Sequence, residues 1–177
     1  MKKIIMIILL LFSCISPVYA ENIENSNSLT INLAEQGRIE KVFDDGSSII
    51  IEDVIVNTRA GLTVTGKKIT GKKYSGLVQF SYYIDTKAYM ANDDPENPIY
   101  YTEIKKVYNE ATTVVGGSFS QRRFMEYNMK ETNFYKAHVA LTAQINGVFK
   151  GVSIVDKGFW LHTYIKNGYL TVEMEES

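Results

Sequence analysis

Cysteine is nearly absent from this chain, which has one such residue, Cys14, among its 177 residues. Since Cys14 lies in the N-terminal apolar stretch, the rest of the chain has no disulfide, no thiol nucleophile and no thiolate metal ligand. Histidine is also scarce, and the two residues present have no spacing typical of a zinc site. The sequence therefore predicts neither a metal nor a cofactor.

The short motifs that mark common catalytic sites are also missing. The chain contains no Gly-x-Ser-x-Gly, Ser-x-x-Lys or His-Glu-x-x-His sequence. Its 19 Lys and Arg residues nearly balance its 20 Asp and Glu residues, so the charge does not favour binding to nucleic acid or to an anionic membrane. We therefore identify no catalytic residue from the sequence and expect no nucleic-acid partner.

The first twenty residues have the layout of a secretory signal peptide. A basic start precedes an apolar run from Ile4 to Phe12, and small residues end the segment at Ala20. The apolar run is far shorter than the roughly twenty residues that a transmembrane helix needs. We expect cleavage after Ala20, no transmembrane helix, and a mature protein that is periplasmic, secreted or on the cell surface.

A lipid anchor at Cys14 is the alternative fate of the same segment. A small residue, Ser13, precedes this cysteine at the end of the apolar run, as at the sites where bacterial lipoproteins are cleaved and acylated. The bulky Phe12 fits such a site poorly, and the helix breaker Pro17 suits ordinary cleavage near Ala20 better. Conventional secretion is therefore the favoured interpretation.

The remaining chain divides into a flexible polar start, 21–28, and a single β domain, 29–177. Strand patterns follow one another along this domain; for example, Val78 to Ile84 place apolar residues at every second position. The Asp45-Gly46 pair between two such runs predicts a hairpin. No run of about ten residues has a helical period. The sequence therefore predicts an all-β fold, either an antiparallel β-sandwich or a β-barrel.

One segment, 118–130, fits two structures. Apolar residues alternate with polar ones around Met125 and Tyr127, which favours a strand. Ser118 followed by Gln121 also suits the start of a short helix that would end near Lys130. The strand is the favoured prediction, and the helix remains the alternative.

The C-terminal part of the domain predicts a meander of four strands, over residues 134–145, 148–155, 159–165 and 169–174. The pairs Asn146-Gly147 and Asn167-Gly168 stand between alternating runs, and both suit two-residue type I′ turns. Such a turn fixes the register, so His162 is predicted to face Glu173 across the last hairpin. The turn at Asn146-Gly147 would likewise place Val139 and Leu141 beside Val152 and Ile154.

One face of this meander collects aromatic and ionisable residues, and it is the candidate site for a partner. Flat rings on a sheet surface can bind sugars, peptides or partner side chains, although the same rings could also belong to a covered core. The pair of His162 and Glu173 also admits acid/base chemistry, but structural pairing across strands explains it more simply. The predicted partner-binding residues are His138, Phe149, Trp160, His162, Tyr164 and Glu173.

Three functions remain open at this point. The favoured one is an exported, non-enzymatic binding protein of the bacterial envelope or exterior, with a protein or glycan partner. A structural subunit of a fimbria-like assembly is the first alternative, because Leu29, Ile31 and Leu33 alternate as a donated strand would. A secreted hydrolase or toxin, with a carboxylate and histidine site assembled by the fold, is the second.

Overall fold

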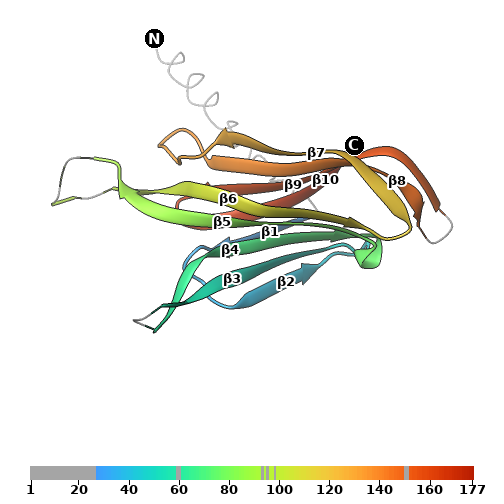
Figure 1. Ribbon diagram of the computed structural model, residues 1–177. Coiled ribbons are helices and arrows are strands. Elements are labelled where there is room, and N and C mark those ends of the chain that lie inside the picture. The colour runs from blue at the N-terminus through green and yellow to red at the C-terminus, as the bar shows by residue number, and fades with distance from the viewer. Residues whose placement is uncertain (1–26, 59–60, 93, 95, 98, 150–151) are drawn as a thin grey trace, which may run out of the picture.

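The chain forms two antiparallel β-sheets of five strands each (Figure 1). The computed structural model describes residues 27–58, 61–92, 94, 96–97, 99–149 and 152–177. The predicted all-β sandwich is confirmed. The predicted leader, 1–20, lies outside the described residues, as does most of the predicted polar start, 21–28. Among the described residues, no helix has the length and hydropathy needed to cross a membrane.

Each sheet is a simple succession of antiparallel neighbours. The N-terminal sheet has the order β2 (Arg38–Val42), β3 (Ser48–Thr58), β4 (Gly61–Lys73), β5 (Val78–Met90) and β6 (Tyr100–Val114). The C-terminal sheet has the order β1 (Ser28–Asn32), β10 (Tyr169–Glu176), β9 (Val152–Lys166), β8 (Ala137–Phe149) and β7 (Gly117–Asn128). A 3₁₀ turn, Tyr74–Gly76, lies between β4 and β5.

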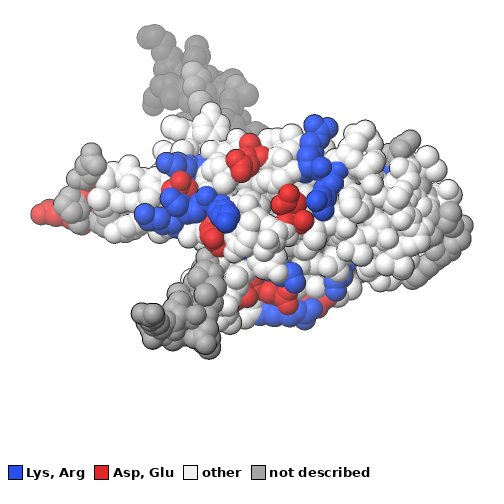
Figure 2. All heavy atoms as spheres, viewed as in Figure 1, with Lys and Arg blue, Asp and Glu red and all other residues white. Residues whose placement is uncertain are grey.

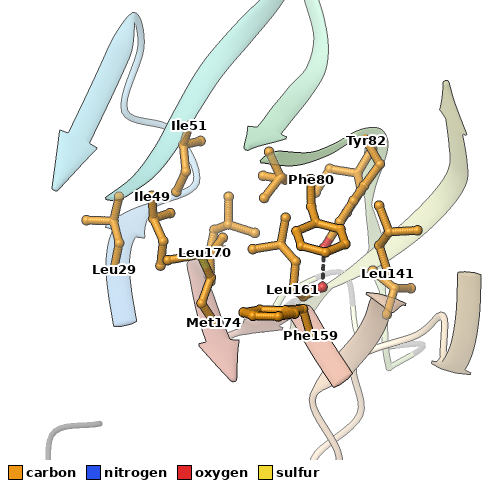
Figure 3. Close-up of a cluster of buried hydrophobic side chains, with 14 of the residues drawn as sticks. Leu29, Ile49, Ile51, Phe80, Tyr82, Leu141, Phe159, Leu161, Leu170 and Met174 are labelled. Carbon is orange, nitrogen blue, oxygen red and sulfur yellow. Dashed lines mark hydrogen bonds between the residues drawn. The ribbon is translucent and has the colours of Figure 1, made fainter. Parts of the chain in front are cut away.

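The core fills the space between the two sheets (Figure 3). Alternate residues of each strand point inward, as the period of a half-buried strand requires. Phe80 of β5 stacks on Phe159 of β9, with ring centroids 6.1 Å apart. Tyr82 is fully buried, and its hydroxyl lies 2.5 Å from Thr163 Oγ1 on the opposite sheet. This hydrogen bond links the two sheets within the hydrophobic core.

Strand β1 belongs to this chain's own core. Leu29 and Ile31 are both buried, and they pair with Val172 and Leu170 of β10. The apolar alternation that suggested a donated strand is therefore used within the chain. It gives no support to strand donation between copies.

The last hairpin confirms the predicted turn and register. Asn167 and Gly168 both have positive φ, 51° and 77°, as a type I′ turn requires. Across this turn Tyr164 pairs with Thr171 and His162 pairs with Glu173. The C-terminal meander is also confirmed: the region predicted as four strands over 134–174 forms three consecutive antiparallel neighbours, β8, β9 and β10, and β7 continues the same meander.

The predicted turn at Asn146-Gly147 is wrong. Neither residue has a positive φ, and both lie inside strand β8. The chain reverses later, since Phe149 at the end of β8 pairs with Val152 at the start of β9. The strand predicted over 148–155 is thus divided between β8 and β9, and its part from Val152 onward continues into the strand predicted over 159–165. The pairing of Val139 and Leu141 changes accordingly, since their β9 partners are Thr163 and Leu161.

Close packing of three strands explains why this pair does not turn. Gly147 lies between two partners, Gly117 of β7 and Ile154 of β9. A Cβ atom on Gly117 would lie 2.4 Å from the carbonyl oxygen of Asn146, so only glycine fits there. The register shifts between Ile145 and Gly147, which marks a β-bulge. Asn146 and Gly147 therefore form part of a β-bulge where β7 and β8 lie close together, and they do not form a turn.

The helical alternative for segment 118–130 is also wrong, because residues 117–128 form strand β7. Phe124 contributes to this choice: it pairs with Leu141 and packs against Tyr82 with ring centroids 5.4 Å apart. A helix would remove this inward side chain from the sheet. Strand β7 is irregular, with register shifts between Ser120 and Arg123 and between Glu126 and Asn128.

Candidate functional site

Five aromatic rings lie in contact on the outer face of the C-terminal sheet, and we call them the ring ladder. His138 is stacked between two tyrosines, with its centroid 4.2 Å from Tyr127 and 4.3 Å from Tyr164. Along β9 the ring of His162 is parallel to those of Trp160 and Tyr164, at 5.5 and 5.9 Å. The ladder therefore spans three adjacent strands.

Strand geometry explains why these rings meet. Trp160, His162 and Tyr164 occupy alternate positions of β9 and so share one face. His138 of β8 pairs with Tyr164, and adjacent strands lie roughly 4.8 Å apart, close to the stacking distance of two rings. Tyr127 joins from β7 at the register shift beside Asn128. The bulge therefore turns Tyr127 toward the ladder.

The two histidines of the chain hydrogen-bond to each other. His138 Nε2 lies 3.0 Å from His162 Nδ1, so one ring donates and the other accepts. Burial, the neighbouring His162 and Lys136 together lower the pKa of His138 to about 4. Burial also lowers the pKa of His162, although Glu175 opposes this shift. Both rings are consequently neutral at pH 7, and in that state one of the two facing nitrogens carries the proton while the other accepts it.

The carboxylate nearest to His162 is not the one predicted. Glu173 is the backbone partner of His162, but the closest carboxylate oxygen, 3.7 Å from His162 Nε2, belongs to Glu175. Burial raises the pKa of Glu173, with Lys136 opposing this shift and Glu175 adding to it. Burial and the charge of Glu173 also raise the pKa of Tyr164 to about 12. The ladder is thus a weakly hydrated surface whose rings carry no charge at neutral pH.

Residues 131–136, in the connection between β7 and β8, lie beside the ladder, and we call them the aromatic loop. At its tip Phe134 is 86% exposed and Tyr135 is 68% exposed. Together with the ladder, the loop borders a hollow of about 430 Å³. The residues that line this hollow are Tyr127, Asn128, Tyr135, Lys136, His138 and Tyr164.

A buried carboxylate holds the aromatic loop in place. Glu131 is 1% exposed, and its two oxygens accept hydrogen bonds from the backbone N–H groups of Thr102, at 3.1 Å, and Asn167, at 2.7 Å. Lys166 Nζ lies 3.8 Å from Glu131 and donates to the carbonyls of Thr132 and Asn133. The loop is therefore fixed to β6 and to the last hairpin, and its exposed rings project from a rigid base.

The structure brings together five of the six predicted partner-binding residues. Tyr164 and Trp160 are partly exposed, whereas His162 is buried at 8% exposure. Phe149 ends strand β8, and its side chain lies outside the described residues. The five residues that share the outer face are His138, Trp160, His162, Tyr164 and Glu173.

Sequence reasoning missed the residues that complete this surface. Tyr127 was placed in a segment whose structure was ambiguous, and its approach to His138 depends on a bulge that the sequence does not mark. Tyr135 and Lys136 stand in a stretch that was predicted to begin a strand. The only available signal was composition, since Phe134 and Tyr135 are two adjacent aromatic residues that interrupt the apolar alternation.

The chemistry that this surface offers is contact with apolar and aromatic groups, together with a few hydrogen bonds. Among the residues that the structure describes, no three metal-ligating side chains come together. The residues that line the hollow carry three tyrosine hydroxyls, the amide of Asn128, the imidazole of His138 and the ammonium of Lys136. Comparison of the chain with known protein families, with curated proteins and with solved structures returns no match.

Proposed function

We propose that this chain is an exported, non-enzymatic binding protein of the bacterial envelope or exterior. In this proposal the ring ladder and the aromatic loop hold a protein or glycan partner. The observation that carries the proposal is the rigid presentation of exposed aromatic side chains, Phe134 and Tyr135, beside stacked rings. Contiguous exposed apolar patches on soluble proteins often mark sites of interaction with a partner or a ligand.

Rigidity supports the proposal because binding then costs little conformational entropy. Glu131 and Lys166 fix the aromatic loop through backbone groups, so its tip does not have to be ordered by a partner. Aromatic side chains have few rotatable bonds and a large contact area, which is why they dominate the energetics of many interfaces. The surface thus combines the two properties that make a small patch bind well.

The proposed location outside the cytoplasm depends on the predicted signal peptide, residues 1–20. A mature protein that begins at Glu21 is expected in the periplasm, in the medium or on the cell surface, with acylation at Cys14 as the alternative. Fractionation of the producing cells, followed by mass determination of the N-terminal peptide, separates these forms. Recovery of molecules that retain Met1 in the cytoplasm would contradict export.

A matched pair of variants tests the binding surface. Phe134→Ser combined with Tyr135→Ser removes the exposed rings of the aromatic loop, and we expect it to abolish retention of the partner from an envelope extract. Val115→Ser combined with Phe119→Ser removes residues that are 54% and 41% exposed, one in the turn between β6 and β7 and the other near the start of β7. This control should retain the partner. Equal retention by both variants would show that the partner binds elsewhere.

No observation favours the two alternative functions over this one. Leu29 and Ile31 are buried in the chain's own core, so strand donation has lost the feature that suggested it. For a hydrolase or toxin, the named pair is His162 with Glu173, and alanine substitution of each residue tests any turnover that is detected. Turnover that both substitutions leave unchanged would exclude this pair from the mechanism.

A further inference from the structure

The hollow beside the aromatic loop has the dimensions of a small-molecule site. Its volume of about 430 Å³ lies within the range of natural ligand pockets, roughly 300 to 1,000 Å³. Asn128 Nδ2 donates to the carbonyl of Lys136 at 3.0 Å, and this bond holds the two sides of the hollow together. With the contacts of Glu131 described above, the walls are formed before any ligand arrives.

Three of the residues that line the hollow are tyrosines, which bring aromatic surface and hydroxyl groups to it. Tyr127 is 48% exposed and Tyr135 is 68% exposed, so part of each ring is open to solvent. His138 is covered on both faces by Tyr127 and Tyr164 and serves as support. Sugar rings match such a surface, because their C–H groups pack on the electron-rich faces of aromatic rings while their hydroxyls bond to the polar margin.

Lys136 is the one charged residue that lines the hollow, given that His138 is neutral at pH 7. Its Nζ lies 5.1 Å from the centroid of the Tyr164 ring. Within the described part of the chain, no carboxylate approaches this ammonium to within 4.0 Å. This ammonium interacts with Glu173 at longer range, and an anionic group on the ligand would be able to bond to it directly.

We propose that the hollow binds a sugar residue that carries a carboxylate, such as a uronic acid. The sugar ring packs against Tyr135 and Tyr127, and its carboxylate accepts hydrogen bonds from Lys136. This inference rests on the proposed function and assigns it a class of ligand. It is confined to one rigid hollow, and it leaves the outer tip at Phe134 free for contacts with the rest of a glycan.

The neighbouring strand edge disfavours an extended peptide as the ligand. Peptides commonly bind by adding a strand to an exposed sheet edge, and β7 is the edge strand here. Its register shifts at Ser120/Arg123 and at Glu126/Asn128 interrupt the regular row of backbone groups that such a peptide would need. A compact ligand in the hollow does not depend on that row.

Two sugar probes and a peptide probe test the inference on the purified protein by ¹H–¹⁵N NMR titration. The first probe is a disaccharide that ends in glucuronic acid, the second is the same disaccharide ending in glucose, and the third is a short glutamate-rich peptide. We expect the acidic disaccharide to bind most tightly and to shift the backbone resonances of Tyr127, Tyr135 and His138. The neutral disaccharide should bind more weakly at the same residues.

Variants then assign the contacts. Lys136→Gln should weaken the acidic disaccharide by about tenfold, the loss of one charge-assisted hydrogen bond, and should leave the neutral one unchanged. Tyr135→Ala should weaken both sugars. The matched controls are Lys157→Gln and Phe119→Ala, at the far end of the same sheet. The Lys157 side chain is 48% exposed and Phe119 is 41% exposed. Both control variants should bind the sugars as the wild type does.

Three results would overturn the inference. Equal affinity for both disaccharides, with no effect of Lys136→Gln, would remove the role of the charge. Binding of the peptide instead of the sugars would give the hollow a protein ligand and would leave the proposed function intact. No binding of any probe, together with retention of an envelope partner by the Phe134→Ser/Tyr135→Ser variant, would overturn the proposed function as well.

Discussion

The outer faces of the two sheets differ in how their polar and aromatic groups are satisfied. On the N-terminal sheet, Glu52 of β3 receives Arg38 of β2 at 3.2 Å and Lys68 of β4 at 3.4 Å, so opposite charges pair across three strands. On the C-terminal sheet the corresponding positions hold the ring ladder, whose histidines are neutral at pH 7. The outer face of the N-terminal sheet therefore carries charges that pair with one another, whereas the ring ladder on the C-terminal sheet is aromatic and uncharged.

This difference indicates which of the two faces would bind a partner with the more favourable free energy. Exposed ion pairs contribute little because water already solvates both charges, and a partner would have to displace that water. Lys and Arg residues are interspersed with Asp and Glu across the middle of the face seen in Figure 2, so no single sign of charge dominates it. Partly exposed rings, in contrast, gain from any apolar contact. The C-terminal sheet is thus the better binding surface.

The N-terminal sheet also places an ion pair inside the protein. Lys67 Nζ lies 2.6 Å from Asp53 Oδ1, and the two side chains are 6% and 5% exposed. Lys67 also donates to the carbonyl of Glu35, while Asp53 Oδ2 accepts from the N–H of Gly37 at 2.7 Å. Burial by itself would raise the pKa of Asp53, but the Lys67 and Gly37 contacts outweigh it and lower that pKa. Four polar groups thus tie the β1–β2 connection to the sheet.

The largest effect on stability is expected from breaking this buried pair. Lys67→Met leaves the Asp53 carboxylate buried without its cation, which should lower the free energy of unfolding by about 3–5 kcal/mol. Adding Asp53→Asn removes the stranded charge and keeps an acceptor for Gly37, so it should restore part of the loss. Urea denaturation measures both changes.

The exposed pair on the same sheet is the control for that measurement. Lys68→Met removes an ammonium that is 34% exposed and 3.4 Å from Glu52, and it should cost less than about 1 kcal/mol. Similar losses for the two lysines would contradict the distinction between buried and exposed pairs on this sheet.

A smaller effect is expected where the two sheets meet. Tyr82→Phe removes the hydroxyl that bonds to Thr163 and leaves that threonine buried without its partner. The expected loss is about 1–3 kcal/mol in the free energy of unfolding. Tyr108→Phe removes a half-exposed hydroxyl that bonds to Asp85 at 3.0 Å, and it should cost less. If Tyr82→Phe left the free energy of unfolding unchanged, the hydrogen bond between Tyr82 and Thr163 would not stabilise the contact between the sheets.

A pH dependence of stability between pH 6.5 and about 4 should come from the aromatic face. The folded protein holds the pKa of His138 at about 4, below its ordinary value of 6.5, so the unfolded chain takes up a proton first as the pH falls. This contribution to stability is complete above pH 6.5 and is lost between pH 6.5 and about 4. His138→Gln should flatten that part of the stability curve.

NMR titration of the imidazole resonances measures the same property directly. The His138 resonance should titrate near pH 4 in the folded protein, and Tyr127→Ala should move its midpoint upward because it uncovers one face of the ring. A His138 midpoint close to 6.5 in the wild type would mean that the ladder does not exclude water from the ring.

Sequence patterns predicted much of the C-terminal sheet, because local rules governed it. The Asn167-Gly168 turn required two residues that accept positive φ, and once that turn was set the register of β9 against β10 followed. The same rule failed at Asn146-Gly147, where contacts from β7 and β9 on both sides kept the pair extended. Turn chemistry thus predicts a reversal only where no third strand competes for the same residues.

The candidate site was predicted in part for the same reason. Trp160, His162 and Tyr164 share a face by alternation alone, and this was visible along one strand. Tyr127 reaches His138 through a bulge, and Tyr135 is placed by the buried Glu131, whose partners lie on β6 and on the turn before β10. Neither contact leaves a periodic signal in the sequence, because each depends on residues far apart along the chain.

The sequence by itself determined the all-β class, the lack of cysteine chemistry in the described chain and the alternation that places rings on one face of β9. These follow from composition and from the two-residue period of a strand, which act over a few neighbouring positions. Only the tertiary structure decided where β8 turns, which strand carries Tyr127 to His138 and how Glu131 fixes the aromatic loop. Those outcomes depend on packing between distant segments, whose energies local patterns do not contain.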